Sequence, residues 1–212
     1  MLQLLNASLT AQALHVAAEL HISDLLVDGP ATAADLAATI GAYQPSLYRL
    51  LRMLTGVGVF REETDGRFAL TTLGSTLCSE GPDSVRDWAL FVGAPEIWQG
   101  YSRLRDTIMT GEPGFILAHG MPLWDYLART PDLGTAFNRW MTRQSDQHNA
   151  AIVAAYDFAP FRVVAASVGA RGRRWPLSCG LTRHCGVFWW TCRKSRPTPF
   201  PWGPPVSLTA AT

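Results

Sequence analysis

The chain has 212 residues, of which 48% are hydrophobic and 17% charged, a composition typical of a globular protein and not of a disordered one. No apolar run reaches the roughly 20 residues of a membrane-spanning helix, and no basic segment precedes the apolar residues at the N-terminus, so a cytoplasmic protein without a membrane partner is expected. The net charge of +1 is unevenly distributed, because all 17 acidic residues lie at or before Asp157 and eight of the 18 basic residues follow it.

Residues 4–26 carry apolar side chains at helical spacing, which predicts a helix that Asp28-Gly29-Pro30 ends. One face of this helix is formed by Leu9, Ala13, Val16, Ala17 and Leu20. A small domain cannot cover such a stripe alone, so we expect self-association, most simply as a twofold dimer.

Two further helices are predicted before residue 56. Thr32 and Asp35 form a capping box at the start of the first, which Gly41 ends. Pro45 suits the first turn of the second, in which leucines recur at helical spacing up to Leu54.

A hairpin is predicted next, because segments 57–60 and 67–70 flank Asp65-Gly66, a strong turn signal. Helix, turn, helix and hairpin in this order predict a winged helix. DNA reading is one use of that fold, yet its second helix offers only Arg49 and Arg52, and the first 157 residues carry 10 basic against 17 acidic side chains. A packing and dimerisation unit is therefore favoured, and a DNA-binding regulator is the weaker alternative.

Helical patterns continue at 72–79, 83–92, 95–109, 122–129 and 131–156, whereas 111–121 is predicted to be a loop. The fold class predicted up to this point is mainly α, with a winged-helix domain at 1–80 and a helical region at 81–158.

An ordered set of motifs resembles the small-molecule O-methyltransferases of the plant caffeic-acid type and the actinobacterial polyketide-tailoring type. The resemblance covers about the first 164 residues. It rests on segments 15–26, 47–60 and 66–74, on Gly111-Glu-Pro, on His119-Gly-Met-Pro-Leu-Trp-Asp-Tyr126, on Phe137-Asn-Arg-Trp-Met141 and on Tyr156-Asp-Phe158.

The resemblance implies a homodimer formed by the winged-helix region and a substrate wall formed by residues 81–158. It assigns Phe137 and Met141 to the face that meets an aromatic or polyketide-like acceptor, with Trp98 as a further substrate-binding candidate. Trp124 and Phe91-Val92-Gly93 are other wall candidates, and ordinary core packing is the alternative for each. The family's Rossmann-like C-terminal α/β domain binds S-adenosylmethionine and supplies a histidine base.

The sequence departs from the family at that last domain. After Tyr156-Asp-Phe158 the family has V-D-V-G-G-G-x-G, whereas this chain has Val163-Val-Ala-Ala-Ser-Val-Gly-Ala-Arg-Gly172, without the acid and the glycine cluster. The family's histidine base lies beyond residue 212. No catalytic and no cofactor-binding residue is therefore assigned, and no cofactor is expected to bind this chain.

A shift of reading frame accounts for the departure. Because tryptophan has one codon, the alternative frame across Phe188 to Thr191 must read Leu-Val-Asp, which fits the family strand whose acid holds the cofactor ribose. The loss of one nucleotide within the codon for Ala166 also explains the absence of the acid and the glycine loop upstream, since restoring that base returns both. The Rossmann-like domain is thus predicted to be missing or scrambled, with an aberrant basic tail at 159–212 in its place.

Two alternatives for the tail are weaker. An authentic nucleic-acid or membrane-binding tail is disfavoured because its prolines preclude a regular helix and its charges form no face. Cys179, Cys185 and Cys192 are spaced too widely for a zinc knuckle, so no metal site is predicted. A disabled O-methyltransferase is the favoured function, ahead of a non-catalytic dimerisation module that could join an intact relative.

Overall fold

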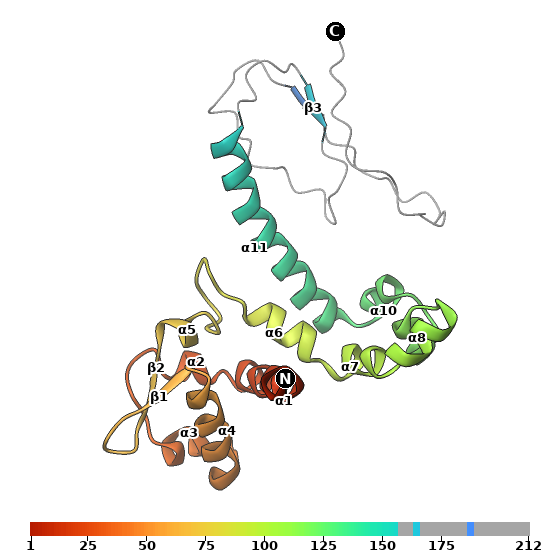
Figure 1. Ribbon diagram of the computed structural model, residues 1–212. Helices are drawn as coiled ribbons and strands as arrows, with labels where there is room; N and C mark the ends of the chain where they lie inside the picture. The colour runs from red at the N-terminus through yellow and green to blue at the C-terminus, as the bar shows by residue number, and fades with distance from the viewer. Residues whose placement is uncertain (157–162, 166–185, 189–212) are drawn as a thin grey trace. The chain divides into compact units, whose positions relative to one another are not determined.

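The computed structural model describes residues 1–156, 163–165 and 186–188 (Figure 1). The chain divides into two units, Met1–Arg143 and Gln144–Thr212, which are described separately. The helices are α1 (Leu2–Glu19), α2 (Ile22–Leu25), α3 (Ala33–Ile40), α4 (Gln44–Gly56), α5 (Thr72–Ser75), α6 (Arg86–Gly93), α7 (Pro95–Ser102), α8 (Leu104–Thr110), α9 (Gly114–His119), α10 (Leu123–Arg129) and α11 (Pro131–Ala155). The strands are β1 (Phe60–Glu62), β2 (Phe68–Leu70), β3 (Val163–Ala165) and β4 (Gly186–Phe188).

The described part is mainly helical, as predicted, and the first unit begins with the expected helices and hairpin. Thr32 and Asp35 form the capping box that opens α3, and Gly41 ends that helix with a φ of 70°. β1 and β2 pair antiparallel with Phe60 opposite Leu70, and a bridge from Ala31 to Phe68 extends the hairpin. The order of helices and hairpin predicted for a winged helix is present.

The core of this region is formed by one face each of α1, α3 and α4 together with the hairpin. Phe60, Phe68, Leu51 and Leu54 are among its fully buried side chains. Burial of this kind removes roughly 1.5–3 kcal/mol of unfavourable hydration per large side chain. Only part of the hydrophobic face predicted on the first helix is buried in this core: Ala13 and Ala17 are buried, whereas Leu9 is exposed.

The predicted single helix over residues 4–26 is wrong in one respect. The chain breaks at His21, whose φ of 54° lies in the left-handed region, so α1 ends at Glu19 and α2 starts at Ile22. The break directs the side chains of Ile22 and Leu26 toward the core, where both are fully buried. Tertiary burial therefore outweighs the helical continuity that the apolar spacing suggested.

Two predictions for residues 95–121 also need correction. The expected helix over 95–109 is divided at Arg103 into α7 and α8, and the expected loop over 111–121 contains α9. A Cβ on Gly114 would lie 2.5 Å from the carbonyl oxygen of Gly100, so glycine is required where α9 crosses α7. Gly114 therefore serves a helix crossing and not a loop.

A second core in the same unit joins α6, α7, α10 and α11. Its buried members are Phe91, Ala94, Ile97, Leu127 and Leu133, and Phe115, Leu123, Tyr126 and Phe137 pack against them.

The second unit contains the end of α11 and a parallel pair of strands, in which Val164 of β3 lies opposite Val187 of β4. β4 was not predicted from the sequence. The aberrant basic tail expected at 159–212 otherwise consists of residues outside the described part.

Candidate functional site

Phe137 and Met141, two of the predicted substrate-binding residues, lie one turn apart on α11. The ring of Phe137 lies 4.9 Å from that of Phe91 on α6 and 5.4 Å from that of Trp124 on α10. Met141 is 38% exposed and Trp124 is 65% exposed. The structure thus brings together four of the residues singled out from the sequence, with two of them open to solvent.

These residues belong to a continuous row of five aromatic rings, which we call the aromatic row. Its members in order are Trp140, Trp88, Phe91, Phe137 and Trp124, with centroid separations of 4.9–5.7 Å. Trp88 stacks on Trp140 and on Phe91 at interplanar angles of 26° and 28°. Aromatic pairs at such distances attract beyond their burial. The row therefore holds α6, α10 and α11 together and ends at the exposed Trp124.

A polar contact fixes α11 beside α6. Arg143 Nη1 donates to the carbonyl oxygen of Ser84 at 3.0 Å and lies 3.4 Å from the Asp87 carboxylate. The Asp87 side chain is 8% exposed, so its negative charge is compensated within the fold by Arg143.

Trp98, the third predicted residue, lies on α7 apart from the aromatic row. Its ring meets Tyr101 edge-on at 6.4 Å. Its indole nitrogen is buried and has no hydrogen-bond acceptor among the described residues.

A cluster of three neighbouring aromatic rings was not predicted from the sequence. Phe115 and His119 of α9 lie 4.3 Å apart, and Tyr126 of α10 lies 5.3 and 4.9 Å from them. His119 Nε2 donates to the carbonyl oxygen of Glu96 at 2.8 Å. His119 is thus a partly buried residue at the end of α9 that joins this helix to α7. The aromatic spacing from Phe115 to Tyr126 was a signal, but the loop prediction concealed it.

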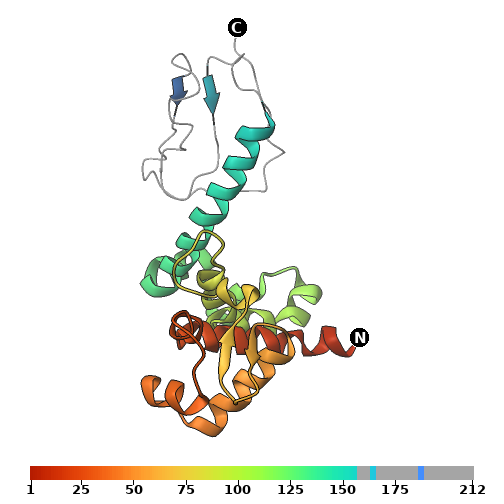
Figure 2. The same ribbon diagram turned by 90° about the vertical axis from the view of Figure 1, so that its left-hand side faces the viewer.

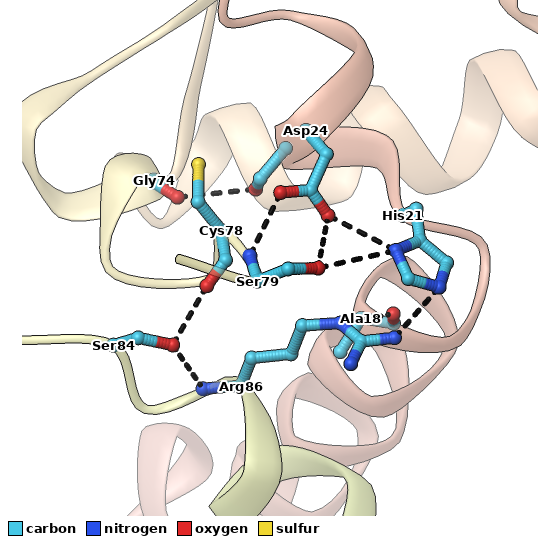
Figure 3. Close-up of polar contacts among 9 residues, drawn as sticks. Ala18, His21, Asp24, Gly74, Cys78, Ser79, Ser84 and Arg86 are labelled. Atoms are coloured by element: carbon cyan, nitrogen blue, oxygen red, sulfur yellow. Dashed lines mark hydrogen bonds and ion pairs between the residues drawn. The ribbon is translucent and has the colours of Figure 1, made fainter. Parts of the chain in front are cut away.

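Four polar side chains converge where α1 meets α2 and α6 (Figure 3). The Asp24 carboxylate accepts hydrogen bonds from the backbone N–H of Ser79 at 2.7 Å, from Ser79 Oγ at 2.8 Å and from His21 Nδ1 at 3.0 Å. Burial raises the pKa of the Asp24 carboxyl, but the hydrogen bonds from Ser79 and His21 together outweigh it, and the pKa lies below its ordinary value.

Arg86 completes this cluster. Its Nε donates to the carbonyl oxygen of Ala18 at 3.1 Å, and its Nη2 lies 2.8 Å from His21 Nε2. Because a guanidinium only donates, Nε2 is the accepting nitrogen and Nδ1 carries the hydrogen. Both ring nitrogens of His21 are engaged, so the histidine is not placed to activate the Ser79 hydroxyl. The cluster fastens the α1–α2 corner to α6 and does not constitute a catalytic triad.

The helix that would read DNA, α4, has one of its two arginines engaged in an ion pair. Arg52 lies 3.0 Å from the Glu62 carboxylate of β1 and donates to the Tyr48 hydroxyl at 3.3 Å. This acidic partner weakens the positive surface that phosphate contacts need.

Within the described residues, no three His, Cys, Asp or Glu side chains lie close enough together to hold a metal ion. None of the helices in that part of the chain is both long and apolar enough to cross a membrane.

This architecture is similar to that of known proteins. A family model for the O-methyltransferase dimerisation domain matches residues 2–80. Phenazine O-methyltransferase PhzM of Lysobacter antibioticus is 37% identical over 164 residues, which are 77% of this chain and 48% of that protein. The 8-amino-8-demethylriboflavin N,N-dimethyltransferase of Streptomyces davaonensis is 36% identical over 162 residues, 76% of this chain and 47% of that protein.

The crystal structure of LaPhzM superposes with a TM-score of 0.73 and 37% identity, covering 77% of this chain and 49% of that one. The chain spans about half the length of the curated relatives that it matches. Both the sequence and the fold of that half agree with the resemblance drawn from the motifs. Residues 2–80 therefore form the dimerisation domain of the O-methyltransferases, and the chain is similar over about three quarters of its length to small-molecule methyltransferases.

Proposed function

We propose that the chain is the dimerisation and acceptor-wall part of an S-adenosylmethionine-dependent O-methyltransferase that acts on an aromatic or polyketide-like small molecule. The aromatic row carries this proposal. Planar rings bind planar ligands by stacking, and Trp124 and Met141 present apolar surface beside Phe137. The relatives named above act, by their names, on phenazine and flavin ring systems.

The proposed layout assigns residues 1–80 to dimerisation, 81–158 to the acceptor wall and 159–212 to the segment in place of the cofactor domain. Dimerisation is supported by the start of α1, which projects from the first unit in Figure 2 and carries Leu2, Leu4, Leu5 and Leu9, each at least 61% exposed. Burying four leucines against a second copy would contribute roughly 1.5–3 kcal/mol per side chain before the entropic cost of association.

The residues present do not fit the cofactor. β3 ends at Ala165, and Ala166-Ser167-Val168 follows where the family has an acid and glycines. An alanine cannot accept the hydrogen bonds that such an acid takes from a bound group. We therefore derive no methyl-transfer step for this chain as written and assign it no base.

The reaction of an intact family member explains what a wall alone can contribute. Displacement at a sulfonium methyl requires the acceptor hydroxyl to be aligned with the methyl, water to be excluded and a base to remove the proton. The aromatic row would supply alignment and a dry surface. The chain as written thus has the proposed wall for the methyl acceptor but no site for the methyl donor. We propose that it is inactive.

Calorimetric titration with S-adenosylmethionine tests the proposal. We expect no binding heat from the purified chain, with PhzM of Lysobacter antibioticus as the positive control. A micromolar dissociation constant for this chain would contradict the proposed loss of the cofactor site.

A non-catalytic dimerisation module is the second candidate, favoured by the same exposed leucines on α1. Sedimentation at tens of micromolar should give a dimer, and Leu5→Lys with Leu9→Lys should give a monomer. A wild-type monomer would remove this candidate.

A gel shift with duplex DNA tests the alternative of a DNA-binding regulator. No retarded band is expected.

A further inference from the structure

The short helix α8 leaves its apolar side chains uncovered. In the described fold none of its seven residues is buried, and Leu104, Ile108 and Met109 are each at least 63% exposed. A helix of this length is well below the roughly 12–15 residues at which a helix begins to hold together without packing. Exposed apolar patches of this kind mark interaction surfaces. The apolar side of α8 therefore requires a surface that covers it.

The exposed residues of α8 continue into the end of α7. Tyr101, which is 57% exposed, precedes Leu104 by three residues, and Ile108 follows Leu104 by four. Side chains at steps of three and four residues lie along one face of a helix. We call this surface the α8 stripe, formed by Tyr101, Leu104, Ile108 and Met109.

The start of α1 carries exposed residues at the same spacing. Leu5 follows Leu2 by three residues and Leu9 follows Leu5 by four. We call this surface the α1 stripe, formed by Leu2, Leu4, Leu5 and Leu9. Two helix faces with this repeat can pack against each other as in a coiled coil. The two stripes are therefore matched in spacing and in apolar character.

The α1 stripe alone is too small for a stable dimer. At roughly 100 Å² per leucine it offers about 400 Å², whereas each partner of a standard interface buries about 800 Å². The α8 stripe adds four apolar side chains of similar size. An interface that contains both stripes reaches the area that a stable dimer needs.

The two stripes of one copy do not cover each other. Both are exposed within the chain, and the start of α1 and α8 lie apart in Figure 1. In a twofold dimer, a contact from α1 of one copy to α8 of the other is repeated in the opposite direction. One kind of contact would therefore cover all four stripes.

The charges around the stripes suit an apolar contact. No acidic residue, lysine or arginine precedes Glu19, so the start of α1 needs no charged counterpart. Beside the α8 stripe, Arg103 is paired with Asp106 at 2.9 Å.

We propose that the α8 stripe binds the start of α1 of a second copy of this chain, and that this contact occurs twice in a twofold dimer. The inference rests on the proposed dimerisation through α1. It goes beyond it by assigning to the interface a surface that lies outside residues 2–80, the matched dimerisation domain.

Photo-cross-linking between copies tests the pairing. The full chain with p-benzoylphenylalanine in place of Ile108 is mixed with isotopically heavy wild-type chain and irradiated, and mass spectrometry separates light from heavy peptides. We expect residue 108 of the light copy to be joined to residues 1–9 of the heavy copy. A cross-link to residues 1–9 of the same copy, to the α8 stripe of the other copy, or to neither stripe would overturn the proposal.

Sedimentation of substituted chains gives a second test. Leu104→Lys with Ile108→Lys should weaken the dimer about a hundredfold, because apolar contacts are lost from both copies while the α1 stripe is unchanged. Val27→Lys with Leu73→Lys is the matched control, since these residues are 60% and 55% exposed and belong to neither stripe.

The control should dimerise as strongly as wild type, and an α8 variant that also does so would overturn the proposal. A dimer without a cross-link between α8 and α1 contradicts this pairing alone, whereas a wild-type monomer contradicts the proposed dimer as well.

Discussion

His15 of α1 and Gly93 of α6 meet where the two helices cross, and the contact leaves no room for a side chain on α6. A Cβ on Gly93 would lie 2.3 Å from the Cβ of His15. The buried His15 ring donates from Nδ1 to the carbonyl oxygen of Ala89 at 3.2 Å, and Gln12 donates to the carbonyl oxygen of Gly93 at 2.9 Å. The helix that begins with exposed leucines is thereby joined to the helix that carries Trp88 and Phe91.

Gly93→Ala should destabilise the fold by about 1–3 kcal/mol, because the added methyl group forces α1 away from α6. Gly56→Ala is the matched control, since a Cβ there meets nothing within 4 Å and alanine is the better helix former. Urea denaturation measures both variants. Equal stability of Gly93→Ala and wild type would show that the two helices cross at a greater distance.

His21→Gly should be more stable than His21→Ala by roughly 1 kcal/mol, the reverse of the order inside a helix. Both substitutions remove the contacts to Asp24 and Arg86, so the difference isolates the backbone at a φ of 54°. Thermal unfolding of the two variants gives the comparison. An alanine variant as stable as the glycine variant would argue against the left-handed conformation.

Asp24 should make stability depend on pH in the acidic range. Its pKa is lower in the folded chain than its ordinary unfolded value of about 3.9. The stabilisation is therefore complete above that value and is lost as the pH falls through the folded pKa. Asp24→Asn should cost about 1–2 kcal/mol at pH 7 and should lose less further stability than wild type between pH 5 and pH 2.5.

Urea denaturation at several pH values checks this, with Asp28→Asn as the exposed control. The control should change stability by no more than about 0.5 kcal/mol at neutral pH. Parallel acid curves for wild type and Asp24→Asn would contradict the assigned role of the carboxylate.

Arg143→Met should destabilise the first unit by about 1–3 kcal/mol, because it leaves the buried Asp87 carboxylate without its cation. Asp87→Asn in the Arg143→Met background should recover part of the loss, since the uncompensated charge is gone. A double-mutant cycle by urea denaturation measures the coupling. Additive effects of the two substitutions would mean that the pair, at 3.4 Å, does not interact.

The sequence predicted the backbone correctly where a helix cap or a turn is determined by one or two neighbouring residues. Thr32 and Asp35, Gly41 and Asp65-Gly66 predicted the start and end of α3 and the hairpin correctly, because caps and turns depend on nearby residues alone. The break at His21 carried no such signal. It is imposed by the burial of Ile22, which requires contacts distant in the sequence.

The candidate site was predictable only in part. Family resemblance indicated Phe137 and Met141, but helical spacing alone does not separate a ligand wall from a core. The stacking of Trp88 on Trp140 joins residues 52 positions apart, and the closeness of Phe115, His119 and Tyr126 depends on how α9 crosses α7 at Gly114. Such long-range relationships have no periodic signature in the sequence.

We propose that a single reading-frame shift within the codon for Ala166 separates this chain from a cofactor-binding methyltransferase. Calorimetric titration of S-adenosylmethionine into the protein made from the gene with one base restored there tests it most directly. The restored frame should read Ala-Asp-Val-Gly-Gly-Gly after Val164, open a longer coding region and give micromolar binding, with the unrestored chain as the silent control. A stop codon within a few dozen codons of the restored base, or a restored protein that binds no cofactor, would show that no such frame shift occurred.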